Sequence, residues 1–526
     1  MLPSLAQLNI ETGKRTREEN DDAQQPQQRQ KKIRDLLQDL PGHLIELILF
    51  ALNEQDCNRL NGLAHVNRQF AEIYKDQSFW EAAIQMNGWE VDWDTGLSPE
   101  KYFKMVCTMD ETHRERLLAI TKDTKVIPPY AFHNCTSLAL TRLPDGLTHI
   151  EVYAFNRCRS LALTSLPVSL TTIEDGAFFE CASLALTSLP VGLKEIGNDA
   201  FFECFSLALT SLPGGLEKIG SGAFVYCKKL ALTKIPDGIQ TIEVRVFDGC
   251  ELLALTSLPV GIQTIGFEAF EGCTSLALTK LPDGLISIGD RAFERCTSLA
   301  LTSLPDSIRQ IGSQAFDNCI LLALTSLPEG VYSIGMCAFA GTSLALTSLP
   351  DGIEDIEQCV FHGCTSLALT SLPRGLKTIG SQAFENCTSL ALTSLPRGLK
   401  TIESQAFENC TSLALTSLPR GLTYIDFYAF KDCTSLALTK LPDGIRKIDN
   451  RAFENCTSLA LTSLPDGLTH IEENAFAGCT SLALTSLPVG LTTIKNGAFA
   501  GCKFDLADRI RILKINPRAF EIVAYN

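Results

Sequence analysis

The sequence predicts an α+β chain in which a small helical N-terminal domain precedes a solenoid of about 16–17 units, each 23 residues long. The main observation is that cysteine recurs every 23 residues from Cys135 to Cys319 and again from Cys364 to Cys502. A fixed period of this length indicates stacked structural repeats. The second observation is that residues 33–89 space their apolar side chains three and four apart, as amphipathic helices do.

The chain is acidic, with 45 lysines and arginines against 60 aspartates and glutamates and a formal net charge of −15. This balance argues against a general affinity for nucleic-acid phosphates, which requires clustered positive charge. The sequence contains no run of 18 apolar residues, so we expect no membrane-spanning helix. The N-terminus turns polar at once and shows no secretion signal. We therefore expect an intracellular protein with no nucleic-acid or membrane partner.

Residues 1–32 are rich in Gln, Asp, Glu and Arg and contain few apolar residues, which predicts a disordered tail. Two basic clusters, Lys14-Arg15 and residues 29–34, have roughly the spacing of a bipartite nuclear signal. These clusters are compatible with localisation in the nucleus as well as in the cytoplasm. A solvated basic tail is the simpler interpretation.

Residues 33–89 are predicted to form three helices. Pro41 opens the first helix, where its missing N–H is harmless. Asp56 and Asp76 are predicted N-caps of the next two helices, because a carboxylate can accept the unpaired N–H groups of a first turn. A unit of about 45 residues is small to be stable alone, so we expect it to pack against a neighbour or a partner.

The order of motifs in residues 33–89 resembles an F-box domain. A Leu-Pro start precedes an apolar helix face, followed by Val-Asn-Arg-Gln-Phe at 66–70 and Asp-Gln-Ser-Phe-Trp at 76–80. In that family the Leu-Pro start and the apolar residues after it dock on the Skp-type adaptor of a cullin-RING ubiquitin ligase. The resemblance assigns adaptor binding to Leu40, Pro41, Leu44, Ile45 and Ile48, with Phe70 and Trp80 as more distant support. The alternative is that these residues form the internal core of a helical cap on the solenoid.

Residues 90–123 are predicted to be a helical linker, because Ser98 can cap a helix that begins at Pro99. The solenoid is expected to occupy residues 124–526, since TKVIPPYAF at 124–132 already matches the second half of a repeat. The last residues, from Cys502, keep the proline and the Ala-Phe pair but lose the Leu-Ala-Leu-Thr run. They are predicted to be the C-terminal cap that a solenoid needs to cover its core.

Each repeat is numbered here from its cysteine as position 1. Leu-Ala-Leu-Thr fills positions 4–7 in all sixteen units from residue 135 up to the unit that begins at Cys502, a proline fills position 10, and phenylalanine fills position 21. We predict a strand over LALTSL that ends at the proline, a second short strand or extended turn over positions 13–16, and a turn whose phenylalanine fills the core. The cysteines are predicted to form a buried stack of thiols, since free cysteine behaves as a small apolar residue.

This repeat resembles the treponemal, or BspA-like, class of leucine-rich repeats, whose unit ends in Ala-Phe, two residues and Cys. The resemblance implies a leucine-rich-repeat solenoid over roughly residues 124–520. Such a solenoid holds a partner through its variable positions, because its fixed positions are explained by packing.

Two variable columns are candidate target-binding surfaces. Position 11 carries arginine in three consecutive units, with lysine three residues after the first two, which predicts a basic stripe for an acidic or phosphorylated protein segment. Recent duplication alone is the alternative. Aromatic side chains occur at position 22 and beside it in successive units, which predicts a patch that contacts a target protein. The alternative is that these side chains pack adjacent turns against each other. The stripe is Arg374, Lys377, Arg397, Lys400 and Arg420, and the patch is Phe179, Phe202, Phe205 and Tyr226, with Val225 beside them.

The unit around residues 338–347 lacks its cysteine, and there Cys337 and Cys359 occupy one variable column in adjacent units, within disulfide reach. Two incidental surface thiols are the simpler interpretation. The seven histidines show no metal-ligand or triad spacing, and no nucleophile has an identifiable base. We therefore expect no catalysis, no cofactor and no metal.

These observations lead to one functional hypothesis and two alternatives. The hypothesis is the substrate-recognition subunit of a Skp–cullin–F-box ubiquitin ligase, with the helical domain on the adaptor and the repeats on a target protein. The first alternative is a leucine-rich-repeat scaffold for protein binding that is unrelated to ubiquitin. The second is an effector from a virus or microbe that uses a host ligase, which the near-identity of the repeats would fit.

Overall fold

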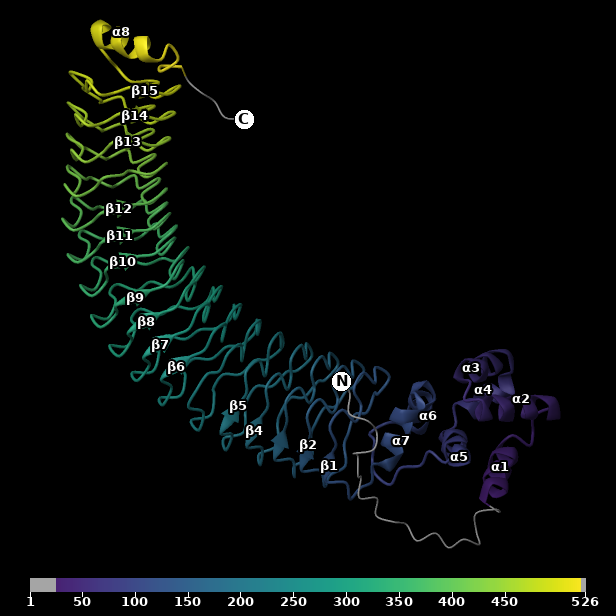
Figure 1. Cartoon of the computed structure of the whole chain (residues 1–526). Helices are drawn as coiled ribbons and strands as arrows, with labels where there is room; N and C mark the ends of the chain where they lie inside the picture. Colours follow the sequence, from purple (N-terminus) through teal and green to yellow (C-terminus); the bar gives the residue numbers. More distant parts are fainter. Residues whose placement is uncertain (1–24, 522–526) are drawn as a thin grey trace. The chain divides into compact units, whose positions relative to one another are not determined.

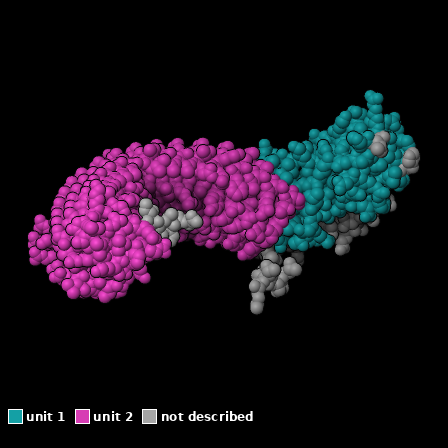
Figure 2. All heavy atoms as spheres, turned by 90° about the horizontal axis from the view of Figure 1, so that it is seen from above, with its two compact units in different colours: residues 1–122, 139–144 teal, residues 123–138, 145–526 magenta. Residues whose placement is uncertain are grey.

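The computed structural model describes residues 25–521 and divides them between two compact units (Figures 1 and 2). The first unit contains the residues up to Lys122 together with Ala139–Pro144. The second contains Asp123–Leu138 and the chain from Asp145 onward. No helix among residues 25–521 is long and apolar enough to cross a membrane.

The first unit is helical. Its sequence-predicted caps at Asp56, Asp76 and Ser98 are confirmed, since each side chain accepts a backbone N–H of the first turn that follows. Asn67 provides a further cap, accepting the N–H of Phe70 at 2.8 Å, and this splits the predicted three helices of residues 42–87 into four. The helices are α1 Gln25–Leu36, α2 Gly42–Asn53, α3 Cys57–Val66, α4 Arg68–Tyr74, α5 Gln77–Asn87, α6 Pro99–Thr108 and α7 Glu111–Ala119.

An aromatic cluster fills the core of this unit. Phe79 lies 5.6 Å from Phe70 and 5.0 Å from Trp80 between ring centroids, and Trp80 lies 5.4 Å from Phe103 of α6. Residues 90–122, predicted as a linker, therefore belong to the same compact unit as the preceding helices.

The segment predicted to be a disordered tail needs a correction. Residues 25–32 are helical, because α1 packs against α5 and its Ile33 is fully buried. The polar composition of 25–32 concealed this, since the apolar anchors stand only at the end of the helix. The rest of the predicted tail, residues 1–24, lies outside the described residues.

The second unit is a solenoid of 23-residue turns, as the sequence predicts, with one two-residue strand at positions 15–16 of most turns. The strands pair in parallel and in register with the same positions of the next turn, as in Ile127 with Ile150. They form sheets β1–β5, β6–β9, β10–β12 and β13–β15, and single bridges at Ile242 and Ile425 extend the second and fourth sheets. The strands are β1 Val126–Ile127, β2 His149–Ile150, β3 Thr172–Ile173, β4 Glu195–Ile196, β5 Lys218–Ile219, β6 Thr264–Ile265, β7 Ser287–Ile288, β8 Gln310–Ile311, β9 Ser333–Ile334, β10 Asp355–Ile356, β11 Thr378–Ile379, β12 Thr401–Ile402, β13 Lys447–Ile448, β14 His470–Ile471 and β15 Thr493–Ile494.

The predicted strand over LALTSL is wrong. In the unit from Cys456, Leu459 and Leu461 are fully buried and Thr462 is exposed, but the segment forms no regular strand. Its backbone makes two bonds to the preceding turn, from the N–H of Ala460 to the carbonyl of Leu438 at 3.1 Å and from the N–H of Thr462 to the carbonyl of Thr439 at 3.4 Å. The leucines therefore fill the core while the strand ladder runs through positions 15–16.

Two stacked columns hold the turns together. The phenylalanines of position 21 stack face to face from Phe132 to Phe499, with ring centroids 5.4–6.0 Å apart. The cysteines of position 1 are buried, as predicted. Each thiol from Cys158 onward also donates to a phenylalanine carbonyl of a preceding turn, as Cys456 does to Phe430 at 3.0 Å. A cysteine fits because its apolar body can be buried while its S–H reaches an acceptor.

The shortened turn preserves this arrangement without its cysteine. Thr342 is buried and its hydroxyl donates to the carbonyl of Phe339 at 2.7 Å, the same carbonyl that accepts the thiol of Cys364 at 3.1 Å. The next thiol, Cys364, contacts the same hydroxyl at 3.3 Å. The strand ladder is interrupted here, between β9 and β10.

The C-terminal segment covers the end of the phenylalanine column. Helix α8, Leu506–Ile515, begins after the cap Asp505. Phe504 and Phe520 flank it and lie 5.2 and 6.3 Å from the ring of Phe499. The apolar end of the stack is thereby kept from water.

Candidate functional site

The predicted basic stripe lies on the surface of the solenoid. Arg374, Arg397 and Arg420 are exposed at position 11 of three consecutive turns. The ladder between β11 and β12 pairs Thr378 with Thr401, so these turns lie one rung apart. No ion pair joins the three arginines to another residue in 25–521. With a rung of about 4.8 Å, the three guanidinium groups are spread over roughly 10 Å along the solenoid.

The two predicted lysines of the stripe differ from each other. Lys377 forms an ion pair with Glu354, and this carboxylate raises the pKa of Lys377. Part of its charge is therefore already compensated. Lys400 is exposed and has no ion pair within the described chain. The free positive charge of the stripe thus comes from Lys400 and the three arginines.

Acidic residues bound the stripe on both sides, which the sequence interpretation missed. The same column carries carboxylates in the four turns before Arg374 and in the two turns after Arg420, and all of them are exposed. These residues are Asp283, Asp306, Glu329, Asp351, Asp443 and Asp466. The stripe is therefore a short positive segment with sharp ends, and only a short acidic segment of a partner would match it.

The predicted aromatic patch is partly assembled. Phe179 and Phe202 stack with centroids 4.5 Å apart, and Phe202 meets Tyr226 edge to face at 6.3 Å. Phe205 and Tyr226 are exposed, whereas Phe179 and Phe202 are half-buried. Val225 is fully buried and so cannot belong to the patch. Both interpretations therefore apply, since the stacked pair joins adjacent turns and its edge reaches the solvent.

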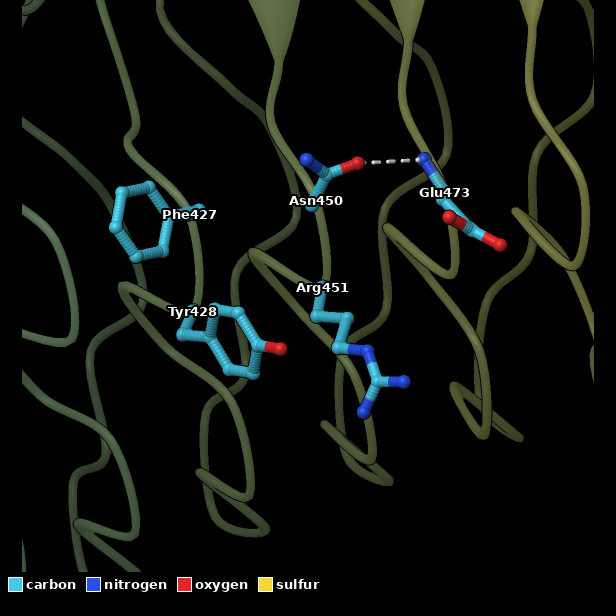
Figure 3. A pocket seen from close by; sticks show the side chains of 5 residues that line it. All are labelled: Phe427, Tyr428, Asn450, Arg451 and Glu473. Carbon is cyan, nitrogen blue, oxygen red and sulfur yellow. Dashed lines mark hydrogen bonds between the residues drawn. The ribbon is translucent and has the colours of Figure 1, made fainter. Parts of the chain in front are cut away.

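A shallow pocket lies across three consecutive turns, at positions 18–19 of their repeats (Figure 3). It has a volume of about 340 Å³ and is lined by Phe427, Tyr428, Asn450, Arg451 and Glu473. Arg451 lies over the ring of Tyr428 at 5.7 Å, and the N–H of Glu473 donates to Asn450 Oδ1 at 3.1 Å. The pocket offers an aromatic wall beside charged groups, which suits an amphipathic side chain of a partner.

A network of buried charges runs across turns 245–295. Arg291 forms ion pairs with Glu268, Glu271 and Glu294, and Arg245 pairs with Asp248 and Glu268. Burial and the nearby charge of Glu294 raise the pKa of Glu271 to about 7. The signal in the sequence was a column of acids at position 22 beside arginines at position 19.

We expect Glu271→Gln to change how stability depends on pH. The folded pKa of about 7 exceeds the ordinary carboxyl pKa of 4.5, so the protonated group stabilises the fold at low pH. This contribution is lost as pH rises from about 4.5 through 7. The glutamine variant does not lose this contribution. The difference in melting temperature between variant and wild type, measured by circular dichroism, should therefore be more in favour of the variant at pH 8 than at pH 4. A difference in melting temperature that stays constant across this range would contradict the assignment.

Comparison with known proteins agrees with this geometry. The family model for the BspA type leucine rich repeat region matches residues 125–254, 253–368, 333–460 and 405–523, which together cover more than half of the chain. The chain belongs to the BspA-type leucine-rich-repeat family. No curated protein matches the sequence.

Three bacterial proteins are among the solved structures similar to these BspA-type repeats. A leucine-rich repeat protein from Bacteroides ovatus is 29% identical, covering 58% of this chain and 87% of its own, with a TM-score of 0.44. A leucine rich cell surface protein from Faecalibacterium prausnitzii is 24% identical over 65% and 86%, with a TM-score of 0.38. The T. pallidum leucine rich repeat protein is 34% identical over 31% and 77%, with a TM-score of 0.26.

The BspA-type match begins at residue 125, so it does not include helices α1 to α7. The structure buries three of the five predicted adaptor residues, Leu40, Leu44 and Ile48, in the core of the helical unit. Pro41 is exposed and Ile45 is half-buried. The exposed apolar side chains of α2 are Leu47 and Phe50, and Arg59 of α3 lies over the Phe50 ring at 5.1 Å. Sequence periodicity did not distinguish which apolar residues of α2 face inward.

Taken together, the BspA-type repeats form a scaffold suited to protein binding. Their fixed positions build the core, and their variable positions present the stripe, the aromatic patch and the pocket on the surface. Among residues 25–521, no group of three or more His, Cys, Asp or Glu side chains could hold a metal ion.

Proposed function

We propose that this chain is a non-catalytic substrate receptor of a Skp–cullin–F-box ubiquitin ligase, acting in the cytoplasm or nucleus. The helical unit docks on the Skp-type adaptor, and the BspA-type repeats hold a target protein. The mechanism is proximity, because a target held near the ligase-bound ubiquitin carrier experiences a high effective concentration of it.

The observation that carries this proposal is the surface of α2. The helix follows the Leu40-Pro41 start and presents Leu47 and Phe50 to solvent, 39% and 50% exposed. Neighbouring exposed apolar side chains on a small domain favour a contact with another protein. Pro41 and the half-buried Ile45 extend the same helix toward its start. Since helix residues two apart face different directions, Ile45 lies on another side of α2 from Leu47. The docking surface proposed here therefore comprises Leu47 and Phe50, while Leu40, Leu44 and Ile48 support it from the core.

A pull-down of the full chain with purified Skp-type adaptor tests the proposal. We expect the wild-type chain to retain the adaptor at micromolar concentration. Complete absence of binding by a chain whose circular dichroism shows it folded would remove the ligase function and leave the scaffold alternative.

The scaffold alternative has its own supporting observation. Residues 139–144 of the first repeat cluster with the helical unit, and the sulfur of Met105 accepts the backbone N–H of Ala139 at 3.2 Å. A helical unit built partly from the first repeat would serve as an N-terminal cap. In that case the helices would bind no adaptor. The hypothesis of a viral or microbial effector would then also be contradicted, because it too requires binding to a host adaptor.

The stripe supports an acidic or phosphorylated segment as the target. We expect the triple variant Arg374→Glu, Arg397→Glu and Arg420→Glu to lose its targets, with affinity falling about tenfold or more as three exposed charge pairs are reversed. The measurement is proximity labelling in cells, comparing the proteins labelled by the wild type and by the variant.

A matched control changes the net charge equally outside the stripe. Lys218, Lys234 and Lys280 are exposed in other turns, and their joint substitution by glutamate removes the same positive charge. Targets that are lost in the stripe variant and kept in the control identify the stripe as the site. Equal labelling by the wild type, the stripe variant and the control variant would show that the stripe is not a target-binding surface.

A further inference from the structure

The side chains of position 11 leave the solenoid at one repeated backbone turn. From the unit of Asp283 to the unit of Arg420, the N–H of position 13 donates to the carbonyl of the proline at position 10, as Leu376 does to Pro373 at 3.2 Å. Position 11 is therefore the second residue of a four-residue turn at the surface. These side chains form a continuous exposed ridge, which consists of Asp283, Asp306, Glu329, Asp351, Arg374, Arg397 and Arg420.

The ridge is divided into two blocks of opposite charge. Its first four side chains, from Asp283 to Asp351, are carboxylates, and its last three, from Arg374 to Arg420, are guanidinium groups. All of them are exposed, and no ion pair within residues 25–521 engages their charged groups. Both blocks are thus available to a partner of opposite charge.

The turns that carry the ridge are evenly spaced. From Phe293 to Phe430, the stacked rings of these turns lie 5.4–6.0 Å apart between centroids. The largest step, 6.0 Å, lies at the shortened turn between Phe339 and Phe361. An evenly spaced row of charges can match a second row of the same spacing. Because the acidic block precedes the basic block, an inverted copy of the same ridge places opposite charges together.

We propose that two copies of this chain pair through their ridges in antiparallel orientation, about a two-fold axis that crosses the ridges between Asp351 and Arg374. The contact is reciprocal under this symmetry, so each pair of residues across the axis occurs twice. An arginine beside a carboxylate can donate two parallel hydrogen bonds to it. The opposed pairs are Arg374 with Asp351, Arg397 with Glu329 and Arg420 with Asp306.

The neighbouring column at position 14 fits the same pairing. A two-fold axis that lies across the ridges keeps position 14 of one copy opposite position 14 of the other. Tyr332, three residues after Glu329, is 54% exposed, and Lys400, three residues after Arg397, is also exposed. The pairing therefore brings the ring of Tyr332 opposite the ammonium group of Lys400, which favours a cation–π contact.

The contact has a defined end. One step outward from Arg420 and Asp306, the symmetry would set Asp283 of one copy against Asp443 of the other. These two carboxylates repel each other, so the pairing is limited to the turns between Asp306 and Arg420. Electrostatic complementarity of this kind fixes the register of two partners more than it raises their affinity.

The pairing should be weak and sensitive to salt. Exposed ion pairs contribute little each and are screened by dissolved ions, and a contact between two ridges is smaller than the interface of a stable dimer. The same arginines form the stripe. Under the proposed function, on which this one consequence rests, a target protein and a second copy would compete for them.

Sedimentation velocity of the purified full chain, without adaptor or target, tests the pairing. At about 50 mM salt the wild type should shift from monomer towards dimer as its concentration rises to about 100 µM, and about 0.5 M salt should weaken this association at least about tenfold. The variant Arg374→Glu, Arg397→Glu and Arg420→Glu should stay monomeric at low salt. The variant Asp306→Arg, Glu329→Arg and Asp351→Arg should do the same, because the opposed blocks then carry like charges.

Mixing these two variants makes the test specific. In the mixture every opposed pair again joins an acidic and a basic side chain, so a heterodimer should form at the concentrations at which the wild type dimerises. Both variants stay acidic overall, since each changes six charge units on a net charge of −15, so general attraction cannot explain this rescue. The control variant, in which Lys218, Lys234 and Lys280 are replaced by glutamate, should dimerise as the wild type does.

Four results would each overturn the proposal. They are a wild type that stays monomeric at low salt, a dimer that salt does not weaken, a triple ridge variant that dimerises as the wild type does, and a mixture that stays monomeric although circular dichroism shows both variants folded. All substituted side chains are exposed, so the variants should fold. Because neither adaptor nor target is present, such a result would leave the proposed function unaffected. Failure of the chain to bind a target would likewise leave the sedimentation result unchanged.

Discussion

Phe384→Ala is expected to lower the free energy of unfolding of the solenoid by about 3–5 kcal/mol, as large-to-small changes in a closed core do. Phe384 is fully buried, and its ring stacks at 5.4 Å on both Phe361 and Phe407. The substitution leaves a cavity in the middle of the column. Turns contact only their immediate neighbours in a solenoid, so the defect should weaken coupling between the two halves as well.

Denaturant unfolding followed by circular dichroism measures this loss. The matched control is Phe427→Ala, because Phe427 is an exposed phenylalanine of the same array, 42% accessible. It should change the unfolding free energy by about 0.5 kcal/mol or less. The Phe384→Ala transition should also broaden if the two halves unfold separately. A Phe384→Ala midpoint no lower than that of Phe427→Ala would contradict the structural role of the column.

The scaffold of this protein was largely predictable because repetition averages out local ambiguity. The same phenylalanine and cysteine columns occur in turn after turn, so a core position such as Phe384 or Cys456 is identified by its recurrence alone. The second predicted strand, over positions 13–16, is confirmed at positions 15–16, whereas the predicted strand over LALTSL was wrong for the opposite reason. LALTSL has the stronger strand composition, yet β14 lies at His470–Ile471, where the in-register ladder forms. Which of two extended segments carries the ladder depends on contacts between turns, which one unit does not encode.

The candidate sites were less predictable, because exposure depends on packing between elements. Helix caps such as Asp56 are local and were found, but the inward face of α2 is set by where α3 and the rest of the unit lie. Leu44 and Leu47 therefore look alike in the sequence and differ in the structure, being 7% and 39% exposed. The acidic residues that bound the stripe stand at position 11, as its arginines do, so their signal was present in the sequence.

The double variant Leu47→Asp with Phe50→Asp is expected to abolish binding of the Skp-type adaptor while leaving the chain folded. Both side chains are exposed, so the aspartates meet water in the free protein. In a complex the same carboxylates would be desolvated against an apolar surface, and two central apolar contacts would be lost. A loss of at least about a hundredfold in affinity follows from these effects together. Pull-down and calorimetry with purified adaptor measure it.

Two further variants make this test specific to the exposed face of α2. Leu252→Asp with Ile320→Asp changes two equally exposed apolar residues of the solenoid, 51% and 52% accessible, and should leave adaptor binding intact. Leu44→Asp places a charge in the core and should unfold the helical unit, so its loss of binding would come with a lost helical signal in circular dichroism. Where the wild type binds the adaptor, undiminished binding by Leu47→Asp with Phe50→Asp would place the docking surface elsewhere, because the residues of α2 that the F-box resemblance names, Leu44, Ile45 and Ile48, are buried or only partly exposed.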